Sequence, residues 1–165
     1  MKLLAFLVTL PILCHANQTE YFVKPDDSTP CPETPCYTLF HYLESIAHYF
    51  ASNTRVSFLP GVHVIDRRSV LYIENVSNLT LAGYNASNSH AANGAKIVCM
   101  KPATLSFWKV VNLVIKHLSI IKCGYPIAMP NGKSAAVYMR EITSLKLVGI
   151  SVEKSTGYGI YGLIF

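Results

Sequence analysis

The cysteines are the residues of this chain with the clearest chemistry, because paired thiols either form disulfides or hold zinc. The sequence contains five of them: Cys14, Cys31, Cys36, Cys99 and Cys123. Cys14 falls in an N-terminal targeting segment described below, and the other four allow three pairings if the chain is exported. We favour Cys31–Cys36, whose short loop contains two prolines, and Cys99–Cys123. Zinc is the alternative, but no Cys-x-x-Cys motif or paired histidine supports it.

Histidines and carboxylates are the next candidates, for metal binding or acid–base catalysis. His41, Glu44 and His48 share one arc at helical spacing and could hold a metal, but the polar, solvated face of an amphipathic helix explains them as well. Aspartate occurs only at Asp26, Asp27 and Asp66. We therefore predict no metal site, cofactor or catalytic residue in this chain, although its status as an enzyme stays open.

Three aromatic residues and four glycosylation motifs suggest contact with carbohydrate in two different ways. Tyr72, Trp108 and Tyr138 fall at outward positions of predicted strands, where aromatic rings can stack on sugars. The motif Asn-x-Ser/Thr occurs at Asn17, Asn75, Asn78 and Asn85. We predict Asn85, Asn75 and Asn17 as glycan acceptors, with Asn85 favoured because its surroundings are polar.

The N-terminal residues have the features of a secretory signal peptide. Lys2 supplies a positive charge, Leu3 to Leu13 is apolar, and Cys14-His15-Ala16 provides a cleavage site after residue 16. A lipoprotein anchor on Cys14 is a rival interpretation, but Leu13 is too large for it. The apolar run is too short to span a membrane, and no later stretch is long enough. We expect a secreted, extracellular protein.

The charge distribution argues against nucleic acid as a partner. Without Lys2, 13 basic residues face 9 acidic ones. The basic residues are scattered singly, except at Arg67-Arg68, and do not form a stripe. Extracellular carbohydrate or a protein surface is the more natural partner.

The region 17–53 is predicted to form an N-terminal cap. Tyr21-Phe22-Val23 predicts a strand, and the Pro-, Asp- and Ser-rich segment after it predicts a loop closed by a disulfide. Thr38 then resembles the N-cap of an amphipathic helix that runs to about Ala51. Such a helix would cover the first layer of the domain that follows.

The region 54–165 contains a motif that occurs three times, at intervals of 34 and 32 residues. Five apolar positions recur in every copy, beginning at Leu71, Leu105 and Val137. Within each copy one step, such as Ile73 to Val76, is three residues instead of two, so we expect a bend there. A fixed period of this length is typical of stacked repeats with a continuous apolar core. Farther upstream, Val56-x-Phe58 and Val62-x-Val64 also alternate, with Pro60-Gly61 between them as a turn.

A polar position precedes one core leucine of each copy and is occupied by Asn78, Asn112 and Ser144. In stacked parallel strands, such amides can hydrogen-bond to the copies above and below. We predict a ladder of these side chains. It would bury Asn78, which would leave its glycosylation motif unused.

From about Thr54 to Phe165, these repeats and the polar ladder resemble the pectin-lyase-like right-handed β-helix proteins, in particular extracellular animal members without an assigned role. The resemblance implies an all-β fold, a right-handed parallel β-helix (solenoid) with an N-terminal capping helix. Enzymes of this family use aspartates clustered on one face, or a calcium-binding carboxylate group with a basic residue. Glu74, Glu141 and Glu153 do not align between the repeats here, so no such set can be assembled.

The last residues begin another repeat, because Gly159-Ile160-Tyr161 resembles Ala136-Val137-Tyr138. We therefore expect the β-helix to be truncated at Phe165. The predicted function is that of a secreted, glycosylated, non-catalytic module with a binding, structural or adhesion role. The alternative is the N-terminal part of a pectin-lyase-like carbohydrate-active enzyme whose site lies in further coils.

Overall fold

The computed structural model describes residues 18–38, 52–66, 69–84, 94–124 and 134–164. The predicted signal peptide (1–16), Asn17, Asn85 and the helix expected after Thr38 lie outside these ranges. Within them every regular element is a β-strand. No helix in the part of the chain that is described has the length and apolar character needed to cross a membrane.

The strands are short and follow one another closely along the chain. They are β1 (Thr19–Lys24), β2 (Cys36–Thr38), β3 (Thr54–Phe58), β4 (Gly61–Ile65), β5 (Ser69–Glu74), β6 (Ser77–Gly83), β7 (Ala95–Cys99), β8 (Ala103–Trp108), β9 (Val111–Lys116), β10 (Leu118–Ile121), β11 (Ala135–Ile142), β12 (Leu145–Val148), β13 (Ser151–Glu153) and β14 (Tyr158–Ile164). Apolar residues alternate with other residues along most of them, which is the pattern of a sheet with one face in a core.

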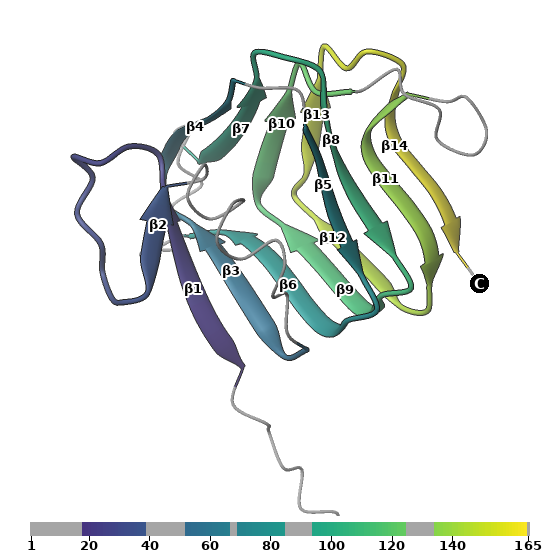
Figure 1. Ribbon diagram of the computed structural model, residues 1–165, viewed down its shortest axis with the longest axis horizontal. Coiled ribbons are helices and arrows are strands. Elements are labelled where there is room, and N and C mark those ends of the chain that lie inside the picture. The colour runs from purple at the N-terminus through teal and green to yellow at the C-terminus, as the bar shows by residue number, and fades with distance from the viewer. Residues whose placement is uncertain (1–17, 39–51, 67–68, 85–93, 125–133, 165) are drawn as a thin grey trace, which may run out of the picture.

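The strands form three parallel sheets that the chain visits in turn (Figure 1). Sheet A has the order β12-β9-β6-β3-β1-β2, sheet B the order β13-β10-β7-β4, and sheet C the order β14-β11-β8-β5. Each circuit of the chain, such as β6 to β8, therefore adds one strand to every sheet. This all-β, parallel arrangement is compatible with a parallel β-helix.

The register between strands confirms the alignment of the three sequence copies. Leu71 pairs with Leu105 and Leu105 with Val137 in sheet C. Leu79 pairs with Leu113 and Leu113 with Leu145 in sheet A. The apolar positions of the first two copies are buried between the sheets, and their side chains pack into one core.

The bends between strands occur where the sequence has one extra residue. Asn75, Lys109 and Glu141 all adopt a left-handed backbone, with φ of 55°, 52° and 55°, at the step from sheet C to sheet A. Asparagine tolerates this conformation better than most residues, while lysine and glutamate adopt it at a cost. The recurrence of one backbone conformation at equivalent positions keeps successive circuits in register.

The core is closed in the middle of the molecule and open at the last circuit. Leu81 is 2 % exposed, whereas Leu147, at the same position two circuits later, is 39 % exposed. Ile160 of β14 is likewise exposed, although its neighbour Val137 is buried. Burial of the repeated apolar positions therefore depends on a strand lying on each side.

The strand β4 exposes the two valines of its alternating pattern and buries the residues that follow them. Val62 and Val64 point to solvent, and His63 and Ile65 face the core. The reason is the pairing with β7, which places His63 beside Ile97 and Ile65 beside Cys99, both of them buried. The His63 Nε2 atom lies 2.8 Å from the Leu59 carbonyl oxygen, and the ring meets Phe58 edge-on. Its Nδ1 atom has no hydrogen-bond partner among the described residues.

We expect this buried histidine to make the fold sensitive to mild acid. Burial lowers the pKa of His63 below its usual 6.5, and the carbonyls of Leu59 and Lys24 oppose this only in part. The unfolded chain therefore takes up a proton before the folded chain does. The free energy of unfolding should fall as the pH decreases through 6.5 toward the folded-state pKa, by up to about 1.4 kcal/mol per pH unit.

Urea denaturation at a series of pH values between 7.5 and 5.5 measures this slope. The variant His63→Gln, which cannot titrate, should show a flatter profile in the same window. Equal slopes for the two proteins would mean that another group is responsible.

Candidate functional site

The structure brings both predicted cysteine pairs to bonding distance. The sulfur atoms of Cys31 and Cys36 are 2.12 Å apart, and those of Cys99 and Cys123 are 1.99 Å apart. Cys99 ends β7 and Cys123 follows β10, the next strand of the same sheet, so this bond links two circuits inside the core. Two disulfides are compatible with an extracellular protein.

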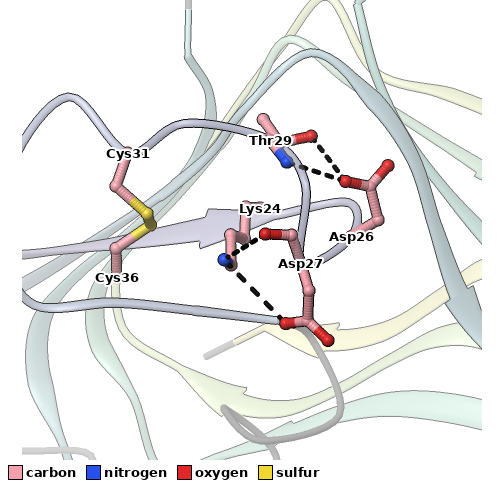
Figure 2. Close-up of a disulfide and its surroundings, with 6 residues drawn as sticks. All are labelled: Lys24, Asp26, Asp27, Thr29, Cys31 and Cys36. Atoms are coloured by element: carbon pink, nitrogen blue, oxygen red, sulfur yellow. Dashed lines mark hydrogen bonds and ion pairs between the residues drawn. A yellow bond between two sulfur atoms is a disulfide. The ribbon is translucent and has the colours of Figure 1, made fainter.

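The connection between β1 and β2, which ends in the Cys31–Cys36 disulfide, projects from that end of sheet A, and the carboxylates of Asp26 and Asp27 order its first part. Figure 2 shows the Asp26 carboxylate accepting hydrogen bonds from the Thr29 backbone N–H at 2.8 Å and from the Thr29 hydroxyl at 2.9 Å. The hydroxyl of Ser28, together with Thr29, lowers the pKa of Asp26. Lys24 donates to the Asp27 carbonyl and also lies 3.9 Å from its carboxylate. These acids bind their own loop instead of facing a shared site.

The polar ladder runs along the corner where each circuit enters sheet A. Asn78 donates from Nδ2 to Asn53 Oδ1 at 2.7 Å and accepts from Asn112 Nδ2 at 2.8 Å. All three asparagines have a left-handed backbone. Asn53 is a rung that the repeats did not indicate, because the sequence around it does not match the motif. Ser144 follows at the next position, where its carbonyl accepts the Leu113 N–H.

Our expectation that the ladder buries Asn78 is wrong, since Asn78 and Asn112 are exposed. The side chain of a corner residue with positive φ lies along the outside of the turn, so the amides of successive circuits can stack while they remain in contact with solvent. Both the nitrogen and the oxygen of the Asn78 side-chain amide nonetheless make hydrogen bonds, to Asn53 and Asn112. Asn75 is also exposed. Its backbone N–H donates a hydrogen bond to the Trp108 carbonyl.

A cluster of aromatic rings lies on the outer face of sheet C, and we call it the aromatic face. It consists of Tyr72, Trp108, Tyr138 and Tyr161, from β5, β8, β11 and β14. The parallel register places Tyr72 opposite Ser106, Ser106 opposite Tyr138, and Tyr138 opposite Tyr161. These positions alternate with the buried apolar ones, so the rings project away from the core.

The rings of the aromatic face contact one another in two pairs. Tyr72 meets Trp108 edge-on, with ring centres 6.1 Å apart. Tyr138 and Tyr161 are stacked, with centres 5.7 Å apart and an interplanar angle of 16°. Ser106, between the pairs, is covered and only 2 % exposed. The result is two pairs of rings on the outer side of sheet C, with the buried Ser106 between them.

Charged groups border the aromatic face in balanced numbers. The Arg140 guanidinium lies 5.1 Å from the centre of the Trp108 ring, and Lys109 Nζ lies 5.3 Å from it. Arg140 also pairs with Glu141 at 3.1 Å. The pKa of Tyr72 is raised, first by burial and then by the negative charge of Glu74. Within the described part of the chain, two basic and two acidic groups border these rings, so their charges balance.

Two polar atoms within the aromatic face lack hydrogen-bond partners in the described part of the chain. They are Trp108 Nε1 and the Tyr138 hydroxyl, and both are buried. Leaving a buried donor unpaired costs about 1–3 kcal/mol. Each of these atoms is therefore a local cost to the stability of the fold.

Our prediction that Tyr72, Trp108 and Tyr138 all point outward was made from alternation alone, and their exposure differs. Tyr72 is 41 % exposed, Trp108 is half-buried, and Tyr138 is only 4 % exposed because Tyr161 stacks on it. Tyr161 was not among the predicted residues. The similarity of Gly159-Ile160-Tyr161 to Ala136-Val137-Tyr138 was the signal that could have identified it.

The carboxylates do not gather near the aromatic face into a metal-binding group. Glu74 lies in sheet C and Glu153 in sheet B, while Glu141 pairs with Arg140. Among the described residues, no three histidine, cysteine or acidic side chains lie close enough to hold a metal ion together. His117 lies at a corner between two strands, with φ of 54°, whereas His63 lies in the core.

Comparison with known proteins does not extend these observations. No protein-family model, curated protein or solved structure matches the chain.

Proposed function

We propose that this chain is a secreted, glycosylated binding module that recognises extracellular carbohydrate through the aromatic face. We further propose that its three parallel sheets form a right-handed β-helix of the pectin-lyase-like kind. The secretory features of residues 1–16, the two disulfides and the glycosylation motifs support the extracellular setting. The order of strands in the three sheets supports the fold.

The aromatic face is the observation that carries the proposal. Sugar rings expose patches of C–H groups that pack on aromatic rings, and their hydroxyls require hydrogen-bond partners. The exposed ring of Tyr72 offers the first kind of contact. Arg140 and Lys109, whose charged groups lie against the Trp108 ring, offer donors for the second. The balanced charges around Trp108 favour a neutral glycan over an acidic one.

The face is proposed to bind sugars without cleaving them. Glycosidic cleavage by two carboxyl groups needs both of them on one face, about 5–10 Å apart. On the outer side of sheet C, Glu74 is next to Tyr72, whereas Glu141 sits at the following corner and is paired with Arg140. Neither is therefore placed as a free acid–base partner of the other.

Glycosylation is proposed at Asn75, together with Asn17 and Asn85, and not at Asn78. The amide of Asn78 is engaged on both sides by Asn53 and Asn112, and a glycan there would compete with the ladder. Intact mass and glycopeptide mapping of protein from a eukaryotic secretory host tests the assignment. A glycan on Asn78 with Asn75 unmodified would contradict it.

Replacing Tyr72 by alanine tests the binding site. We expect this variant to bind neutral oligosaccharides about tenfold more weakly than the original protein, the equivalent of about 1.4 kcal/mol. Tyr72 is partly exposed, so the fold should survive its loss. Arg140→Leu leaves the rings in place but removes a charged donor beside Trp108, and so separates stacking from hydrogen bonding.

Glycan-array screening followed by titration calorimetry provides the measurement. Met100→Ala is the matched control, because Met100 is 62 % exposed and lies at the end of β7 in sheet B. Binding that Tyr72→Ala and Met100→Ala affect equally would count against the aromatic face. Shortened oligosaccharide products in the same samples would show cleavage and overturn the non-catalytic assignment.

A further inference from the structure

A second group of side chains, on the outer face of sheet A, is unrelated to the aromatic face. Arg55 of β3, Lys116 of β9 and Lys146 of β12 all alternate with core-facing residues. The register runs from Arg55 to Thr80, from Thr80 to Val114, and from Val114 to Lys146. We call these three cations the basic column. In the sequence they are isolated residues, and only the parallel pairing of distant strands brings them to one face.

The basic column contains more positive charge than its surroundings neutralise. Arg55 Nε lies 3.0 Å from the Glu20 carboxylate of the adjacent strand β1. Lys116 and Lys146 have no ion-pair partner among the described residues. Glu20 is itself committed to Arg55 and to the Ser57 hydroxyl. Among the residues that the structure describes, one carboxylate therefore faces three cations.

The electrostatics of Lys116 are consistent with this crowding. Burial lowers its pKa, and the positive charges of Arg55 and Lys146 lower it further, while Glu20 acts in the opposite direction. The charges of Arg55 and Lys146 thus reach Lys116 even though they come from different strands. An anion at this position would relieve the repulsion between the cations.

We propose that the basic column is a binding site for an acidic polysaccharide whose sulfate or carboxylate groups meet successive cations along sheet A. Neighbouring strands are about 4.8 Å apart, so β3 and β12, separated by two strands, are about 14 Å apart. A single phosphate cannot span this length, whereas acidic groups repeated along a sugar chain can. Between the cations, Thr80 accepts a hydrogen bond from Gln18 Nε2 and Ala82 is fully buried, so the acidic groups would meet the protein at the charged ends of the three side chains.

The proposal does not depend on the aromatic face. The two lie on different sheets, and neutral and acidic sugars make different demands on a protein. A module with both could hold two kinds of extracellular polysaccharide, or two parts of one.

The double variant Lys116→Gln/Lys146→Gln tests the site on the full chain, with heparin as the sulfated probe and dextran as the uncharged one. We expect the original protein to bind heparin in a salt-dependent manner, and the double variant to bind about tenfold more weakly with a shallower salt dependence. The control is Lys96→Gln/Lys122→Gln, which removes the same charge from sheet B. It should change heparin affinity less than twofold.

Several results would overturn the basic column as a polysaccharide site. They are absence of heparin binding by the original protein, an equal loss of heparin affinity in both double variants, or tighter binding to vesicles of anionic lipid than to heparin. Saturation by inorganic phosphate alone at similar affinity would also do so, because it would indicate a single-anion site. Tyr72→Ala should bind heparin normally, which separates failure here from failure of the neutral-glycan proposal. Thermal unfolding of both double variants verifies that each remains folded.

Discussion

Alanine at position 81 is expected to lower the free energy of unfolding by about 3 kcal/mol, within the 2–5 kcal/mol range of buried leucine truncations. Leu81 lies in β6 and is 2 % exposed, between Val56 of β3 and Ile115 of β9. Both neighbours are themselves buried, so the surrounding strands cannot close the cavity without breaking their own pairing.

Leu147→Ala is the matched control, because Leu147 occupies the same position of the repeat in the last circuit. Leu147 is 39 % exposed, so much of its side chain already contacts water. Its replacement should therefore lower the free energy of unfolding by only about 1 kcal/mol or less. Urea unfolding of the two variants, followed by circular dichroism, measures the difference. Similar decreases in the free energy of unfolding of both variants would show that a strand on each side is not what buries these leucines.

Removal of the core disulfide is expected to have a comparable effect. Cys99 and Cys123 are separated by 24 residues, and the loop-entropy relation for that length predicts a loss of about 3–4 kcal/mol for Cys99→Ala/Cys123→Ala. Both residues are buried, so the variant also loses packing. The bond joins β7 to the segment after β10, and without it two circuits of sheet B are held only by strand pairing.

Cys31→Ala/Cys36→Ala provides the comparison. Those cysteines are separated by 5 residues, in an exposed loop, and the same relation gives roughly 2 kcal/mol. Denaturation without reductant should therefore rank the core pair above the loop pair. The reverse ranking would indicate that the loop, and not the core, limits stability.

Much of the architecture could be predicted from local patterns. The repeated apolar positions specified which residues align, and the structure pairs Leu71 with Leu105 and Val137 as the motif required. The three-residue step marked the bends at Asn75, Lys109 and Glu141. These predictions succeed because each depends on a few neighbouring residues, and alternation and turn geometry are local properties.

Other features could not be predicted, because they depend on strands that are distant in the sequence. Which face of β4 is buried is one example, because Val62 and Val64 are the apolar residues, yet pairing with β7 places His63 inside. Asn53 joins the ladder although its surroundings do not match the repeat. Exposure of Asn78 follows from its position on a corner, which no spacing in the sequence reveals.

The candidate sites show the same division. Sequence by itself determined which residues alternate out of the core, and hence that Tyr72 and Trp108 belong to an outer surface. It also supplied the pairing hypothesis for the cysteines. Only the tertiary structure decided that Tyr161 covers Tyr138, that Arg140 lies over Trp108, and that Arg55, Lys116 and Lys146 share one face. The physical reason is that parallel strands place residues about 30 positions apart in the chain within about 5 Å of each other, so the surface is assembled across circuits and not along them.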